Sequence, residues 1–153
     1  MARDLPRGGK IQSRLTQKRS GVIQHKGVIM SISQNVETCK KGYAAFAAGD
    51  VETVLSYYDD DVEWVVPGNS TVSGTYRGKA EVTELFAKVA EQPFTTTPSR
   101  FLADGDVVVI LTQVTAGGES APQADVATFR DGKIVKEQNL GDTAMFERVY
   151  GTK

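Results

Sequence analysis

The feature that most constrains the fold of this chain is a series of four strand-like segments in its second half. Turn signals separate segments that are expected to be β-strands, over residues 95–103, 106–115, 122–130 and 133–141. Asp104-Gly105 and Asp131-Gly132 favour tight hairpin turns, and residues 116–120 predict a longer, flexible hairpin loop. Because short connections join antiparallel neighbours, we expect a four-strand antiparallel meander.

The residues before this meander mostly have the periodicity of helices. Apolar residues recur at helical spacing over residues 33–48 and 79–90, and a shorter helix is expected after Asp50, with Tyr58 on its apolar face. The three aspartates at 59–61 are expected to form a solvated connection. Residues 62–66 then alternate as a strand that ends at Pro67-Gly68, and residues 142–149 are expected to pack as a last turn or edge.

Helices that precede most of the strands favour an α+β fold, with a curved antiparallel or mixed sheet and three N-terminal helices on one face. A ligand pocket is expected between these helices and the concave face of the sheet. The strand from Val107 to Leu111 is apolar on both faces, although the helices can bury only one of them. We therefore expect a homodimer through the convex face of the sheet; an additional cover within a monomer is the alternative.

The basic residues are distributed unevenly along the 153-residue chain. Residues 1–30 hold seven Lys and Arg residues and one Asp, a net charge of +6, so the remaining residues carry about −7 of the total of −1. Residues 1–30 are expected to form a disordered basic extension that could act as a transit peptide or a nucleic-acid arm. The alternative is that Met30 is the natural start, and residues 31–153 form one domain in either case.

Composition excludes several classes of protein and site. The acidic domain argues against nucleic-acid binding, and no apolar run is long enough to span a membrane. A single cysteine, Cys39, cannot form an internal disulfide, which favours a reducing cytoplasm. The one histidine, His25, lies in the basic extension, so residues 31–153 contain no catalytic triad and no His-based metal site. Chemistry in this domain must use carboxylates, Tyr, Cys, Lys or Arg, and we expect neither a metal nor a cofactor.

Four segments carry a resemblance to a known family. In chain order they read YAAFAAGDVETVLSYYDDDVEW, VVPGNSTVSGTYRG, DVATFRDGKIV and GDTAMF. Residues 31–149 resemble the nuclear transport factor 2-like superfamily, in particular its SnoaL-like, ketosteroid-isomerase-related branch. The resemblance implies a cystatin-like α+β barrel, in which a curved sheet and three helices form an open cone that is commonly dimeric. The family contains isomerases, polyketide cyclases, epoxide hydrolases, dehydratases and members without known activity, so the fold alone does not define the function.

The catalytic residues of the family are retained only in part. Where ketosteroid isomerases carry an oxyanion-binding Tyr in the first helix, this chain has Gly42, with Tyr43 one residue further on. Where they carry the catalytic base before the Pro that ends the first strand, it has Val66. Asp125 matches their second Asp and also the pocket Asp used by SnoaL-like cyclases, whereas the Arg-x-Asp pair of limonene-epoxide-hydrolase-like members is missing. The resemblance therefore argues against steroid isomerisation by the usual Tyr/Asp/Asp mechanism.

Asp125 is the candidate catalytic residue. It shares a strand face with Ala127 and Phe129, and an apolar pocket on that face would raise the pKa of its carboxyl toward a useful range. A solvated or ion-paired carboxylate near the strand end is the alternative. The candidate ligand-binding residues are aromatic or polar, and most of them could instead be core residues. They are Trp64, Tyr43, Tyr58, Phe86, Gln113 and Phe129. Glu137 is expected to be a solvated strand residue, with a polar pocket group as the alternative.

These observations support three hypotheses for the function. The first is a cofactor-free acid/base enzyme, such as an isomerase, cyclase or hydratase/dehydratase, which acts on a small, mostly apolar or aromatic molecule. In this hypothesis Asp125 transfers the proton, and Trp64 and Phe86 form walls of the pocket. The second is a binding module that keeps the pocket without the chemistry. The third is a dimeric interaction domain whose cone is filled by its own side chains.

Overall fold

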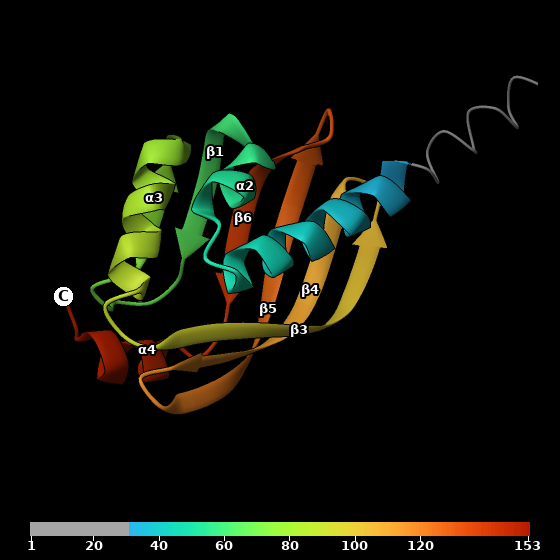
Figure 1. The fold of residues 1–153 in the computed structure, drawn as a ribbon. Coiled ribbons are helices and arrows are strands. Elements are labelled where there is room, and N and C mark those ends of the chain that lie inside the picture. Colours follow the sequence, from blue (N-terminus) through green and yellow to red (C-terminus); the bar gives the residue numbers. More distant parts are fainter. Residues whose placement is uncertain (1–30) are drawn as a thin grey trace, which may run out of the picture. The chain divides into compact units, whose positions relative to one another are not determined.

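The computed structural model describes residues 31–153, and the predicted basic extension over residues 1–30 lies outside the described residues. The described part is a curved, unclosed six-stranded sheet with helices on one face (Figure 1), which confirms the predicted α+β class. The strands are β1 (Tyr58–Val66), β2 (Gly74–Arg77), β3 (Phe94–Asp104), β4 (Val107–Ala116), β5 (Glu119–Arg130) and β6 (Lys133–Leu140). The helices are residues 31–47, α2 (Val51–Ser56), α3 (Gly78–Val89) and α4 (Thr143–Tyr150).

The sheet is mixed. Its strand order is β2-β1-β6-β5-β4-β3, in which β1 and β6 run parallel and all other neighbours run antiparallel. The predicted meander is confirmed as β3 to β6, and the parallel pairing brings β1 back beside the last strand of the meander. This pairing places residues from β1, β5 and β6 side by side on the concave face.

Two hairpin turns of the meander differ from the expectation. The turn after β3 consists of Gly105 and Asp106, because Asp104 still pairs with Val107. The expected long loop at 116–120 is a two-residue turn of Gly117 and Gly118, both with positive φ, as the tight turns between antiparallel strands require. The predicted Asp131-Gly132 turn is confirmed, with φ of 51° and 76°.

The N-terminal helices end and begin at recognisable capping groups. Gly49 has φ of 73°, and the amide of Asp50 donates to the carbonyl of Ala45 (2.9 Å), which closes the helix over residues 31–47. The Asp50 side chain then caps α2 by accepting a hydrogen bond from the Thr53 amide (3.0 Å). These caps define the short turn between the two helices. Both helices bury residues against the sheet, Cys39 from the first and Val54 from α2.

Several predicted boundaries were wrong. Tyr58 and the aspartates at 59–61 belong to β1, so the second helix ends at Ser56 and the aspartates do not form a separate connection. The four residues of β2 were not among the expected strands. The last segment forms a full helix, α4, which is capped by Asp142 and is additional to the three helices expected.

Among residues 31–153, no helix has both the length and the apolar composition that a membrane span needs.

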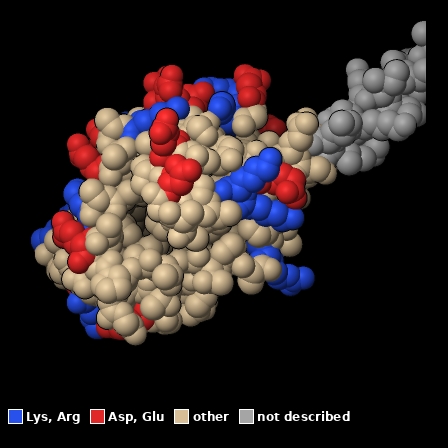
Figure 2. Space-filling view, viewed as in Figure 1, with Lys and Arg blue, Asp and Glu red and all other residues tan. Residues whose placement is uncertain are grey.

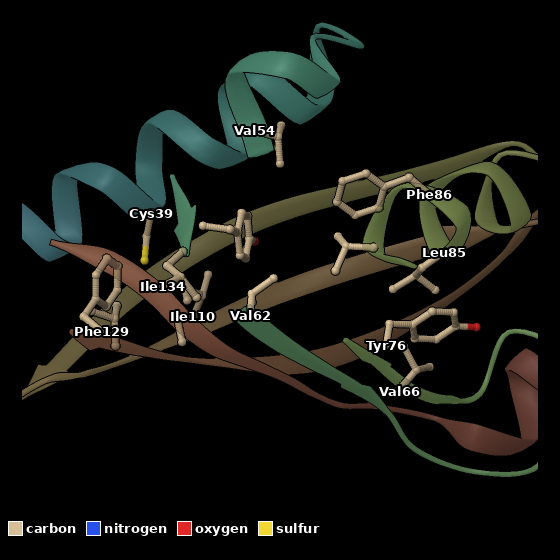
Figure 3. Close-up of a cluster of buried hydrophobic side chains, with 14 of the residues drawn as sticks. Cys39, Val54, Val62, Val66, Tyr76, Leu85, Phe86, Ile110, Phe129 and Ile134 are labelled. Carbon is tan, nitrogen blue, oxygen red and sulfur yellow. The ribbon is translucent and has the colours of Figure 1, made fainter. Parts of the chain in front are cut away.

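The main core lies between the helices and the concave face. Figure 3 shows Cys39 and Val54 from the helices above Ile110, Phe129 and Ile134 of the sheet. A smaller cluster lies at the end of the sheet, where Met145 of α4 packs against three inward residues of β4 and β5. These are Val114, Ala116 and Ala121. Many residues of the main core also line a cavity on the concave side of the sheet.

Candidate functional site

A cavity lies between the helices and the concave face of the sheet. Including its opening to solvent, it encloses about 880 Å³. Its walls come from the helix at 31–47, from α2, α3 and α4, and from every strand except β2. Figure 2 shows a recess in this face of the molecule, surrounded mostly by uncharged residues. Most of the lining is aliphatic or aromatic, including Phe46, Val54, Leu85, Phe86 and Ile110. A cavity with this mostly apolar lining suits a small, mostly apolar molecule.

Asp125 is the centre of a hydrogen-bonded network in this cavity. Its side chain is on the concave face of β5 and the residue is only 5% exposed. Gln123 Nε2 and Asn139 Nδ2 each donate to Oδ1 at 2.7 Å, and the Tyr43 hydroxyl donates to Oδ2. Burial raises the pKa of Asp125, and the three hydrogen bonds oppose this rise because they stabilise the anion. The alternation of β5 thus placed Asp125 correctly inside the cavity, and its catalytic role stays a prediction.

Trp64 holds the Asn139 side chain in the orientation that Asp125 requires. The indole Nε1 can only donate, and it donates to Asn139 Oδ1 at 2.7 Å. The carboxamide nitrogen of Asn139 is therefore turned toward Asp125, which lies directly opposite Asn139 in the β5–β6 register. Trp64 is connected to the Asp125 carboxylate through one intervening side chain.

The Trp64 ring is also packed by aromatic side chains of the chain itself. Tyr58 stacks on it, with ring centroids 5.5 Å apart and an interplanar angle of 24°. Phe86 of α3 meets it edge to face, at 5.4 Å and 87°. All three residues line the cavity, so the two sequence-based interpretations, a core aromatic and a cavity wall, both apply to Trp64.

Glu137 is the residue that sequence reasoning misplaced most. It was expected to be solvated, but it is 4% exposed and lines the cavity. Strand β6 has a register shift: Phe129 pairs with Ile134 and Thr128 pairs with Lys136, so one residue of β6 has no counterpart in β5. A regular alternation starting at Ile134 would put Glu137 and Asn139 on the outer face. The bulge turns both side chains inward instead.

The buried carboxyls raise the pKa values of the groups around them. The pKa of Glu137 lies well above its usual range, first because of burial and second because of the charge of Asp125. Burial, followed by the charge of Glu137, raises the pKa of Tyr58 and brings that of the Cys39 thiol to about 12. The pKa of Tyr43 is also raised, first by burial and then by Asp125. Cys39 is therefore an unreactive, protonated thiol at neutral pH.

The structure brings together four of the six predicted ligand-binding residues. Tyr43, Tyr58, Trp64 and Phe86 line the cavity. Gln113 does not, because it is exposed on the opposite face of β4 from the inward residues Ile110 and Thr112. Phe129 is buried in the main core but is not part of the cavity wall.

Gln123 is the functional residue that the sequence could have shown. It lies two positions before Asp125, so the alternation that places Asp125 inside the cavity places Gln123 there as well. Asn139 carried no such signal, because no residue of the segment KIVKEQNL marks the bulge.

Within residues 31–153, no three His, Cys, Asp or Glu side chains are grouped in a way that could hold a metal ion.

The curved sheet and its enclosed cavity define a small-molecule-binding protein of the nuclear transport factor 2-like class. The chain belongs to the SnoaL-like domain family, whose model matches residues 40–137. It is 29% identical to the uncharacterized protein Rv0034 of Mycobacterium tuberculosis over 111 residues, which are 71% of this chain and 77% of the relative.

Solved structures show the same fold. Bal32a, from a soil-derived mobile gene cassette, superimposes with a TM-score of 0.74 at 25% identity, over 78% of this chain and 98% of its own. TerC, which was co-crystallized with polyporic acid, has a TM-score of 0.68 at 29% identity, over 78% of this chain and 99% of its own.

Proposed function

We propose that this protein binds a small, mostly apolar molecule in the cavity and catalyses a cofactor-independent acid/base reaction on it. Isomerisation, cyclisation, hydration and dehydration belong to this class. The observation that carries the proposal is the position of Asp125, a buried carboxylate in an apolar cavity with three hydrogen-bond donors. The similarity to TerC supports small-molecule binding by this fold, because that protein was co-crystallized with a small molecule, polyporic acid.

In the proposed reaction Asp125 is the proton acceptor. Its three donors leave lone pairs on Oδ2, which has Tyr43 as its one donor among the described residues. A carboxylate held in this way needs no reorganisation before it removes a proton from a bound ligand. Desolvation raises the basicity of the carboxylate, and the donors fix its direction.

A second candidate function is ligand binding without chemistry. It is favoured by Val66, a buried apolar residue at the position before Pro67 where related isomerases place their base. In this case the Asp125 network would recognise a polar group of the ligand. The two candidates share the cavity and differ only in whether a proton moves.

Ligand identification followed by isotope exchange separates these candidates. Molecules that co-purify with the protein would be identified by mass spectrometry and then incubated with it in D₂O. An enzyme incorporates deuterium into the ligand or converts it, and Asp125→Asn should slow this by about 10²–10⁴-fold. Asp61→Asn, at an exposed position of β1, is the matched control and should leave the rate unchanged. Binding without exchange in the unsubstituted protein would refute the enzyme and leave the binding module.

The outer face of the sheet, which faces away from the helices, is proposed to be a homodimer interface. Leu102 and Leu140 are the exposed large hydrophobic residues of residues 31–153, each 49% exposed, and both are on this face. Between them the register aligns Leu102 with Val109 and then Val126, and Leu111 with Ala124 and then Leu140. A second copy of the sheet would cover this apolar surface.

A further inference from the structure

A series of hydrogen bonds connects three side chains of the cavity, from Trp64 of β1 through Asn139 of β6 to Asp125 of β5. The indole Nε1 of Trp64 donates to Asn139 Oδ1 at 2.7 Å, and Asn139 Nδ2 donates to Asp125 Oδ1 at 2.7 Å. All three residues line the cavity. Tyr58 stacks on the indole ring and Phe86 contacts it edge to face, so aromatic packing fixes the direction of the indole N–H.

The two ends of the Asn139 carboxamide have different partners. An amide oxygen only accepts hydrogen bonds, whereas an amide nitrogen and the indole nitrogen only donate them. If the carboxamide were inverted, its NH₂ group would meet the indole N–H of Trp64, and its oxygen would meet the Asp125 carboxylate. Inversion would therefore break both hydrogen bonds and bring two donors together. As long as the indole N–H is present, Asn139 Nδ2 faces Asp125.

The charge of Asp125 depends on its hydrogen-bond donors. Within the part of the chain that the structure describes, no Lys, Arg or His lines the cavity. The titratable groups that face Asp125 from other elements are Tyr43 of the N-terminal helix, Tyr58 of β1 and Glu137 of β6. Burial raises the pKa of each of these groups and favours the protonated form, so none of them supplies a positive charge.

The orientation of Asn139 therefore affects which form of Asp125 is stable. Burial raises the pKa of Asp125, and the hydrogen bond from Asn139 is one of the three that oppose this rise. With the carboxamide inverted, the Asn139 oxygen would repel the carboxylate and would accept a hydrogen bond from the protonated carboxyl instead. The observed orientation stabilises a proton acceptor, and the inverted one would stabilise a proton donor.

We propose that Trp64 is a positioning residue whose indole N–H holds Asn139 in the orientation that keeps Asp125 a proton acceptor. This inference rests on the proposed function, in which the ionised Asp125 removes a proton from the ligand. It gives Trp64 a role that its contacts with Tyr58 and Phe86 do not require, because another aromatic ring could make those contacts without an N–H group.

The single Trp of the chain allows the N–H group to be removed without a change in the shape of the side chain. Growth on a tryptophan analogue changes position 64 alone. β-(3-Benzothienyl)alanine carries sulfur in place of the indole N–H, so it keeps the bicyclic ring and cannot donate. 5-Fluorotryptophan keeps the N–H and is the matched control. In carboxyl ¹³C NMR titrations of the full chain, the pKa of Asp125 should be higher with the benzothienyl analogue, because Asn139 is free to invert.

Two further measurements test whether the effect passes through Asn139. In ¹⁵N NMR, the side-chain NH₂ signals of Asn139 should follow the ionisation of Asp125 with 5-fluorotryptophan and should lose this dependence with the benzothienyl analogue. In the Asn139→Leu variant, the two analogues should give the same pKa of Asp125. Trp64→Phe is a second way to remove the N–H and should also raise the pKa of Asp125.

The pH profile of the proposed reaction provides a test of the role in catalysis. Deuterium exchange into the co-purified ligand should lose roughly 3- to 10-fold in rate on the acidic side of the profile with the benzothienyl analogue, the change expected for one hydrogen bond. The rate at higher pH, where Asp125 is ionised in both proteins, should change less. An equal loss of rate at every pH would show a purely structural role for Trp64 and would overturn the inference.

The outcomes separate this inference from the function on which it rests. An equal pKa of Asp125 with both analogues overturns the inference and leaves the proposed function standing. A difference between the analogues that persists in Asn139→Leu also overturns it, because the effect then does not pass through Asn139. Binding without exchange in the unsubstituted protein overturns the proposed enzyme, whereas the NMR titrations test the role of Trp64 without any ligand.

Discussion

Replacing Tyr43 by Phe removes one hydroxyl group and tests whether Asp125 is an anion in the folded protein. The hydroxyl is the one donor to Asp125 Oδ2 within the described residues, because Gln123 and Asn139 both donate to Oδ1. The Phe ring can keep the edge-to-face contact with Phe101, whose centroid is 6.1 Å away. The substitution therefore changes the hydrogen bond and little else.

The expected cost depends on pH. A hydrogen bond to a charged group contributes about 1.5–3 kcal/mol, and a neutral one contributes about 0.5–1.5 kcal/mol. At pH 7.5, Tyr43→Phe should therefore destabilise the fold by about 1.5–3 kcal/mol if Asp125 is an anion and by about 0.5–1.5 kcal/mol if it is neutral. The cost should be smaller at a pH below the pKa of Asp125, and that pKa should rise in the variant because the anion has lost a donor.

Urea unfolding at pH 4 and pH 7.5 measures both costs, and carboxyl ¹³C NMR follows Asp125 directly. The same substitution in an Asp125→Asn background gives the double-mutant cycle, in which the cost at pH 7.5 should drop to that of a neutral hydrogen bond. Tyr58→Phe removes a hydroxyl from the same cavity without a bond to Asp125 and is the matched control. An equal cost of Tyr43→Phe at both pH values and in both backgrounds would show that Asp125 is not a buried anion.

Three further predictions concern the cavity and the outer face. The pKa of Glu137 is higher in the folded than in the unfolded chain, so the stability that Glu137 contributes is complete below about pH 4.5 and is lost as pH rises through the folded pKa. Thermal unfolding measured across pH should show this loss of stability. Glu137→Gln should make the loss smaller without abolishing it, because the pKa of Asp125 is raised as well and the pKa values of Tyr58 and Cys39 are also raised in the folded protein. A Cβ at Gly141 would lie 2.6 Å from Gln123 Oε1, so Gly141→Ala should displace the Gln123 side chain that donates to Asp125. The pKa of Asp125, measured by NMR, should then rise. An unchanged pKa would show that the Gln123 hydrogen bond does not stabilise the Asp125 anion. Val109→Lys, in the centre of the outer face, should give monomers in sedimentation velocity, whereas Glu84→Lys on the exposed side of α3, away from this face, should not; a Val109→Lys dimer would exclude this interface.

The fold was predictable where local signals and regular alternation extend over whole elements. The alternation of β5 is unbroken from Ala121 to Phe129, so the position of Asp125 followed from the sequence. The turn at Asp131-Gly132 and the cap at Asp50 are likewise encoded locally. The α+β class and the cavity followed from the order of these elements.

The parts that could not be predicted depend on pairing between distant segments. Strand β2 has only four residues, and its pairing with β1 gives it strand structure that its own sequence does not indicate. The inward turn of Glu137 and Asn139 results from a bulge that is defined only against β5. The site therefore contains more polar groups than the sequence indicated, and the additional ones come from β6.

The contact between Trp64 and Asn139 gives this protein an internal optical reporter. Trp64 is the only tryptophan of the chain, and its indole N–H is bonded to the side chain that also holds Asp125. A ligand that enters the cavity, or a proton that moves onto the carboxylate, changes the surroundings of this one fluorophore. Emission from the unlabelled protein can thus be assigned to a single position at the centre of the site, and the fluorescence of Trp64 can follow ligand arrival and carboxylate protonation in real time.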